Sequence, residues 1–93
     1  MTAPVPRTGD PAPPTVGLRL MIVEDDPRLG ETLARSFALR GYDVVRAASV
    51  PEALAQMAAH RPDRAVVDLK LADGSGLEVI AALAGLDPRP QIV

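Results

Sequence analysis

From residue 18 onward, short apolar runs alternate with longer stretches in which apolar residues recur every three or four positions. The first run, LRLMIV at 18–23, is almost continuously apolar, which is typical of a parallel strand covered on both faces. Further runs at 43–47 (DVVRA) and 64–69 (RAVVDL) predict a second and a third strand. The last residues, 91–93 (QIV), predict the first part of a fourth strand.

A helix is predicted over residues 27–40, between the first two of these strands. Asp26 is a residue type favoured at the N-cap, and Pro27 suits the first helical position, where its missing N–H would have no partner. The apolar stripe of this helix consists of three residues spaced four apart: Leu29, Leu33 and Phe37. Gly41 is expected to end the helix at the C′ position.

A second helix is predicted after the second strand. Ser49 and Glu52 have the three-residue separation of a capping box, which predicts the start of a helix. The helix is expected to end near His60, because Pro62 prevents its continuation. Its buried face is expected to contain three residues: Leu54, Met57 and Ala58.

A loop and a third helix follow the third strand. Residues 71–76 (LADGSG) are predicted to form the loop, with a turn at Asp73-Gly74 and Gly74 at positive φ. Ser75 and Glu78 have the separation of a second capping box. The buried face of the helix is expected to contain three residues: Leu77, Ile80 and Leu83.

This alternation of strands and helices is typical of an α/β fold. Right-handed crossovers between successive strands give a doubly wound parallel sheet with helices on both faces. We predict the strand order 2-1-3-4, truncated at the fourth strand, so that the chain is an N-terminal fragment of a longer protein. Apolar side chains near Ile80, Leu83 and Ile92 are therefore expected to be poorly covered.

Residues 1–17 differ in composition from the rest of the chain. They contain five of the ten prolines and no apolar periodicity, which predicts a disordered proline-rich leader before a single domain at 18–93. The leader lacks the apolar central region of a signal peptide. The run LMIV from Leu20 is far too short to cross a bilayer, so no membrane association is expected.

Composition and charge exclude several kinds of chemistry. The chain has no cysteine, which excludes disulfides, thiolate nucleophiles and thiolate metal sites. Its single histidine, His60, excludes a multi-histidine zinc site. The net charge of -2 and the scarcity of aromatic residues give no sign of a nucleic-acid surface, so no direct contact with nucleic acid is expected.

Acidic residues follow two of the predicted strands, at the edge of the sheet where α/β proteins bind ligands. Glu24, Asp25 and Asp26 follow the first strand, and Asp68 lies near the end of the third. If these strands are neighbours, their carboxylates meet, and the mutual repulsion of the carboxylates favours a bound cation. Oxygen ligands of this kind suit Mg²⁺, and a carboxylate beside Mg²⁺ is a candidate nucleophile towards phosphorus.

Simpler structural roles also account for these residues one at a time. N-capping alone explains Asp26, and a single aspartate at a strand end, such as Asp68, is commonly a cap or turn residue. Lys70 is interpreted as a solvated loop charge. Three further charged residues are interpreted as helix charges without a catalytic role: Arg28, Arg35 and His60.

From about residue 18 to 93, the chain resembles the receiver domain of bacterial two-component response regulators. Two segments carry the resemblance: LMIVEDDPRLGETLARSFALRGYDVVRAASVPEAL and DRAVVDLKLADGSGLEVI. Asp25 and Asp68 lie 43 positions apart, as expected for the metal-binding and phosphorylated aspartates of the family. Within the family, VVDLKLADGSGLEVI most resembles the redox-responding regulators of the RegA, PrrA and ActR kind.

The resemblance implies a flavodoxin-like fold and a role for each acidic residue. Asp68 would be the phosphoacceptor, Asp25 and Asp68 would bind Mg²⁺ directly, and Glu24 would bind it through water. The backbone carbonyl of Lys70 would be a further metal ligand, and Asp26 would keep its capping role. Two glycines would shape the loop beside the site: Gly74 and Gly76.

The resemblance also implies a cytoplasmic signalling protein rather than an enzyme. A sensor histidine kinase would phosphorylate Asp68, and an output domain beyond the chain, of DNA-binding type, would control transcription. The switch Ser/Thr and Lys of the family would lie beyond Val93. Ala72 replaces a proline that is common in the family.

Two other functions are consistent with parts of the sequence. A magnesium-dependent phosphatase of the haloacid-dehalogenase type needs Asp-x-Asp, whereas this chain has Asp68-Leu69-Lys70. A pseudo-receiver that acts only as an interaction module would not need the acidic residues Glu24 and Asp25, which are present together with Asp68.

Overall fold

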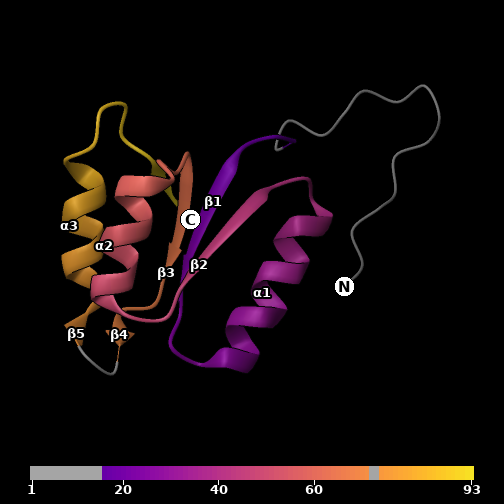
Figure 1. Ribbon diagram of the computed structural model, residues 1–93, viewed down its shortest axis with the longest axis horizontal. Coiled ribbons are helices and arrows are strands. Elements are labelled where there is room, and N and C mark those ends of the chain that lie inside the picture. Colours follow the sequence, from indigo (N-terminus) through magenta and orange to yellow (C-terminus); the bar gives the residue numbers. More distant parts are fainter. Residues whose placement is uncertain (1–15, 72–73) are drawn as a thin grey trace.

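The structure is a computed structural model that describes residues 16–71 and 74–93. These residues form six strands and three helices, and Figure 1 shows how the elements are arranged. The strands are β1 (Arg19–Val23), β2 (Asp43–Ala47), β3 (Arg64–Val67), β4 (Lys70–Leu71), β5 (Gly74–Ser75) and β6 (Gln91–Ile92). The helices are α1 (Pro27–Leu39), α2 (Val50–Ala59) and α3 (Gly76–Ala84).

The main sheet consists of four parallel strands in the order β2-β1-β3-β6. In the register of the sheet, Val23 of β1 lies beside Ala47 of β2 on one side and Val67 of β3 on the other. The short strand β6 pairs with the first two residues of β3. The predicted doubly wound α/β fold with strand order 2-1-3-4 is therefore confirmed, with β6 as the fourth strand.

The helices cover both faces of the sheet, with α1 on one face and α2 and α3 on the other (Figure 1). Under α2 and α3 lies a cluster of ten buried residues: Met21, Val23, Ala47, Val50, Ala53, Met57, Ala65, Leu71, Val79 and Leu83. Under α1 three residues are buried, Leu20, Ile22 and Tyr42, and the half-buried Leu33 and Phe37 pack against them. The larger part of the core therefore lies between the sheet and α2 and α3.

Short polar side chains begin all three helices, as the sequence predicts. Each accepts a backbone N–H group of the first turn: Asp26 from Arg28 at 2.9 Å, Ser49 from Glu52 at 3.2 Å and Ser75 from Leu77 at 3.1 Å. The first helix ends at Leu39, and Gly41 follows it with a φ of +94°. The carbonyl of Gly41 also accepts the N–H of Gly17 at 3.1 Å, which joins residue 17 to the start of β2.

The buried faces of α2 and α3 differ from the prediction. Leu54 and Leu77 are 43% and 62% exposed, whereas Ala53 and Val79 are fully buried. Two of the predicted core residues are buried: Met57 and Leu83. Successive helical residues are about 100° apart, so a shift of one position moves a leucine from the sheet to the surface.

The loop predicted at residues 71–76 contains a short antiparallel hairpin instead. β4 pairs with β5, with Lys70 opposite Ser75 and Leu71 opposite Gly74. Because Gly74 is an extended strand residue, the expected positive φ is wrong. Ala72 and the predicted turn residue Asp73 lie outside the described residues. The third strand ends at Val67, two residues earlier than predicted.

The expectation of poor coverage near the fourth strand is correct for one residue of three. Ile92 is 41% exposed, but Leu83 is fully buried and Ile80 is half-buried. The reason is that α2 packs beside α3 and shields its inner face. The disordered leader is predicted over residues 1–17, of which 1–15 lie outside the described residues, whereas residues 16–17 form a turn in which Gly17 donates its N–H to Gly41. None of the helices described has the length and apolar character needed to span a lipid bilayer.

Candidate metal centre

Three carboxylates meet at the carboxyl edge of the sheet. Glu24 and Asp25 follow β1, and Asp68 follows its neighbour β3. One carboxylate oxygen of each lies within 4.8 Å of the others, and all three residues are half-buried. The sequence predicted this meeting on the condition that the first and third strands are adjacent, and they are.

Backbone hydrogen bonds hold two of these residues beside the sheet. The N–H of Glu24 donates to the carbonyl of Ala47 at 3.0 Å, and the N–H of Asp68 donates to the carbonyl of Val23 at 2.9 Å. Both bonds continue the ladder of the sheet by one residue. The positions of these two backbones are therefore set by the rigid strands rather than by a loop.

The loop after β3 orients the side chain of Asp68. Its Oδ1 accepts the N–H of Lys70 at 3.1 Å. Gly76 approaches from the start of α3, and a Cβ on it would lie 1.9 Å from the carbonyl oxygen of Asp68. A side chain cannot be accommodated against a backbone atom at that distance, so glycine is required there. At Gly74 a Cβ would meet the Glu78 carboxylate at 3.0 Å.

Asp26 does not take part in the carboxylate cluster. Its Oδ1 accepts the N–H groups of Arg28 at 2.9 Å and Leu29 at 3.3 Å, as expected of an N-cap. Its own N–H donates to Oε2 of Glu24 at 3.2 Å. The capping interpretation of Asp26 is therefore confirmed. Of the three consecutive acidic residues, Glu24 and Asp25 belong to the carboxylate cluster and Asp26 caps α1.

Crowding of negative charge alters the titration of Glu24. Burial raises the pKa of the Glu24 carboxyl above its ordinary value, and the neighbouring Asp25 and Asp68 raise it further. The hydrogen bond from the Asp26 N–H acts in the opposite direction and lowers the pKa. The net direction is a raised pKa, so the ionised form of Glu24 is disfavoured relative to a freely exposed glutamate.

The set of donors fits a hard divalent cation. Several carboxylate oxygens without nitrogen or sulfur ligands suit Mg²⁺ or Ca²⁺, and Mg²⁺ typically keeps water in part of its coordination shell. Neither Glu24 nor Asp68 has an ion pair with a cationic side chain of the described chain. The Lys70 carbonyl lies two residues after Asp68, and its role as a metal ligand stays a prediction.

An open pocket of about 260 Å³ adjoins the cluster on the side of β2. Its lining consists of Glu24, Arg46, Ala47, Ala48 and Glu52. The Arg46 guanidinium donates to the carbonyl of Pro27 at 3.2 Å. Arg46 was not predicted as a site residue, although the position of an arginine near the end of the strand run DVVRA could have indicated it.

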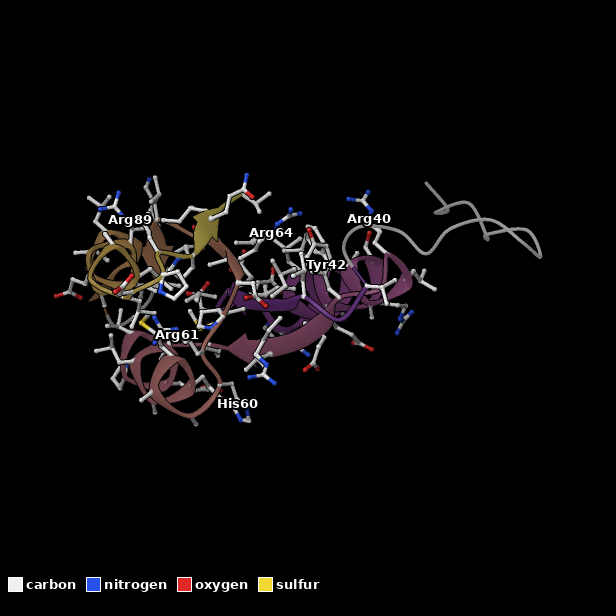
Figure 2. All side chains as sticks on the ribbon, turned by 90° about the horizontal axis from the view of Figure 1, so that it is seen from above. Arg40, Tyr42, His60, Arg61, Arg64 and Arg89 are labelled. Atoms are coloured by element: carbon white, nitrogen blue, oxygen red, sulfur yellow. The ribbon has the colours of Figure 1, made fainter. Side chains whose placement is uncertain are left out.

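The other charged residues considered from the sequence lie away from this site. Arg35 pairs with Glu31 one helical turn earlier on α1 at 2.9 Å. Arg28 is exposed in the first turn of α1. His60 follows α2 at the opposite edge of the sheet and is exposed (Figure 2).

The sequence profile of the response regulator receiver domain family matches residues 20–93. The match covers most of the chain, so the chain belongs to this family, whose receiver domains are signalling modules. The predicted family membership is therefore confirmed.

Individual relatives agree with this assignment. The chain is 47% identical over 66 residues to the acid tolerance regulatory protein ActR of Rhizobium meliloti (strain 1021), covering 71% of this chain and 34% of that protein. It is 40% identical over 74 residues to the photosynthetic apparatus regulatory protein RegA of Cereibacter sphaeroides, covering 80% and 40%. Identity to the transcriptional regulatory protein KdpE of Mycobacterium tuberculosis is 35% over 74 residues, covering 80% and 33%. The chain thus spans about a third of the length of ActR and KdpE.

A solved structure of a response regulator from Burkholderia pseudomallei has the same fold. It superposes with a TM-score of 0.76 at 36% sequence identity, covering 81% of this chain and 44% of that one. That structure contains a phosphorylated aspartic acid, a calcium ion and citrate.

Proposed function

We propose that this chain is a phosphoacceptor receiver domain, in which Asp68 receives a phosphoryl group from a sensor histidine kinase in the presence of Mg²⁺. The observation that carries the proposal is the approach of the Glu24, Asp25 and Asp68 carboxylates to within 4.8 Å of one another. The phosphorylated aspartate and calcium ion of the Burkholderia response regulator support the same chemistry.

Asp68 acts as the nucleophile through the carboxylate oxygen that Lys70 leaves available. Oδ1 accepts the Lys70 N–H, which fixes the plane of the carboxylate, so we assign the attack to Oδ2. The bond from this oxygen to phosphorus forms while the bond from phosphorus to a histidine nitrogen of the kinase breaks. The histidine nitrogen keeps the electron pair of the broken bond.

The acidic residues would supply the ligands of the cation. Asp25 and Asp68 would hold Mg²⁺ directly together with the backbone carbonyl of Lys70, and Glu24 would act through water. When bound, Mg²⁺ offsets negative charge between the carboxylate and the entering phosphoryl group. Asp26 takes no part, because its carboxylate caps α1.

The wider setting follows from the family and extends the proposal to the whole protein. We assign the receiver domain to residues 18–93 and a leader to 1–17, and we place the protein in the cytoplasm. The domain is not an enzyme with turnover, and this part of the protein does not contact nucleic acid. A further output domain regulates transcription, in keeping with the name of the transcriptional regulatory protein KdpE.

Phosphotransfer from the cognate kinase tests the proposal. Radiolabelled kinase should label the wild-type protein, and Asp68→Asn should abolish the label because the amide is not a nucleophile. Asp63→Asn is the matched control, since Asp63 lies at the opposite edge of the sheet. Labelling of Asp68→Asn at the wild-type level would contradict the assignment, and an unlabelled wild type would favour the pseudo-receiver.

A further inference from the structure

Charge is divided between the two edges of the main sheet. Among the residues that the structure describes, the carboxyl edge has six acidic residues against three cationic ones: Glu24, Asp25, Asp26, Glu52, Asp68 and Glu78 against Arg28, Arg46 and Lys70. Within residues 16–71 and 74–93, the amino edge has five arginines against three aspartates: Arg19, Arg40, Arg61, Arg64 and Arg89 against Asp43, Asp63 and Asp87. A chain of net charge -2 therefore has a locally positive surface, which its composition conceals.

One arginine engages two of the three aspartates at the amino edge. Arg19 pairs with Asp43 at 3.4 Å through its side chain, and its backbone N–H donates to the Asp63 carboxylate at 2.8 Å. Arg61, Arg64 and Arg89 have no ion pair with any acidic residue that the structure describes. Within the described part of the chain, no carboxylate therefore forms an ion pair that would balance their positive charge.

Arg64 is held in place by an aromatic residue rather than by a carboxylate. The Arg64 guanidinium donates to the Tyr42 hydroxyl and lies over its ring, 5.7 Å from the centroid. Tyr42 is buried and packs edge-on against Phe37, with the ring centroids 5.6 Å apart. Arg64 is therefore fixed in position while it keeps its full charge and free N–H donors.

The register of the sheet brings the unbalanced arginines to neighbouring elements. Arg64 begins β3 and lies beside Gln91, the first residue of β6. Arg89 lies two residues before Gln91, so it is close to the segment that leads into β3. The N–H of Gln91 donates to the carbonyl of Asp63 at 2.9 Å, which joins the two segments. Figure 2 shows Arg61, Arg64 and Arg89 at this edge, with Arg64 beside Tyr42.

We propose that the amino edge, centred on Arg61, Arg64 and Arg89, is a docking surface for an acidic segment of a partner polypeptide. Guanidinium groups recognise carboxylates through paired N–H donors, and arginine is enriched in protein interfaces. The three interspersed aspartates would repel the continuous phosphates of DNA, whereas a polypeptide can place its carboxylates between them. This surface lies opposite Asp68, so the proposal does not depend on phosphorylation.

Titration with an acidic peptide tests the docking surface. A fluorescent oligoglutamate peptide is added to the 93-residue chain at low salt, and anisotropy and amide NMR shifts are followed. Shifts are expected at residues 60–64 and 89–91. Arg61→Gln and Arg89→Gln should each weaken binding roughly two- to fivefold, as for exposed ion pairs. Arg64→Gln should weaken it more, because Tyr42 holds that side chain in place.

Arg35→Gln is the matched control, since it removes the same charge from α1, outside the amino edge. It should bind the peptide within twofold of the wild type, and circular dichroism checks the fold of every variant. Arg61→Gln and Arg89→Gln alter exposed side chains, so they test the proposal even if Arg64→Gln unfolds. Unchanged binding in both, or shifts at residues 24, 25 and 68, would overturn the proposal. Tighter binding of a DNA duplex of equal charge would overturn the proposal in favour of DNA as the partner. Self-association of the chain through this edge would overturn it in favour of a second copy of the chain.

Discussion

The two edges of the sheet use the same kind of side chain in opposite ways. At the amino edge, Asp43 pairs with the Arg19 side chain, which offsets its charge, and Asp63 accepts the backbone N–H of Arg19. At the carboxyl edge, Glu24 lies beside Asp25 and Asp68, and its pKa is raised by burial and, to a lesser extent, by these two neighbouring carboxylates. The carboxylates of the amino edge therefore support the fold, whereas the charge of those at the carboxyl edge is left for a ligand to compensate.

The largest expected difference is in the free energy of unfolding, when the glycines at the two ends of α3, Gly76 and Gly85, are replaced by alanine. Gly76→Ala places a Cβ 1.9 Å from the carbonyl oxygen of Asp68, so the backbone must shift. We expect a loss of about 3 kcal/mol or more in the free energy of unfolding, measured by urea denaturation. Gly85→Ala is the control, because its Cβ would meet nothing closer than 3.4 Å and its φ is -82°. It should be neutral or stabilising by up to about 1 kcal/mol, and equal losses for both would refute the close-approach argument.

Neutralising single carboxylates should lower the Mg²⁺ affinity at the carboxyl edge and leave it unchanged at the amino edge. Asp25→Asn should weaken binding roughly 10- to 100-fold in a calorimetric titration, since even outer partners of a metal contribute that much. Glu24→Gln should have a smaller effect because it acts through water, and Asp26→Asn should have almost none because asparagine caps equally well. Asp43→Asn, at the amino edge, should leave the affinity unchanged. Equal losses for Asp25→Asn and Asp26→Asn would contradict the division of the acidic triplet.

The smallest effect concerns the pH dependence of stability without metal. Because the pKa of Glu24 is raised on folding, its negative charge costs stability above the ordinary carboxyl pKa, and this cost is absent below it. Glu24→Gln should therefore raise the melting temperature at neutral pH, and the gain should disappear as the pH falls below the ordinary carboxyl range. Asp43→Asn should give no such gain, because Arg19 compensates Asp43. A destabilised Glu24→Gln at neutral pH would show that the charge is not crowded.

The sequence predicted the elements governed by local chemistry. The three caps depend on residues two or three positions apart, and Asp26, Ser49 and Ser75 all accept N–H groups as expected. The strand order was predictable because handedness and short connections leave few topologies. The meeting of Asp25 with Asp68 followed from that order alone.

The sequence was less informative where packing decides between neighbouring residues. Leu54 is more hydrophobic than Ala53, yet the smaller residue lies against the sheet because α2 packs closely there. The need for glycine at position 76 depends on the Asp68 carbonyl, which no local pattern reveals. Likewise, the cluster around Arg64 and Tyr42 joins segments 22 residues apart, and overall composition conceals its charge.

Phosphorylation by a small donor tests the central claim most directly, because it requires the chemistry of the carboxyl edge alone. The protein is incubated with acetyl phosphate, and intact mass and peptide mapping locate the product. We predict one phosphoryl group on Asp68 when Mg²⁺ is present, and none when Mg²⁺ is removed or Asp68 is changed to asparagine. Labelling at another residue would contradict the assignment of Asp68, and labelling independent of divalent metal would contradict the role of Glu24 and Asp25.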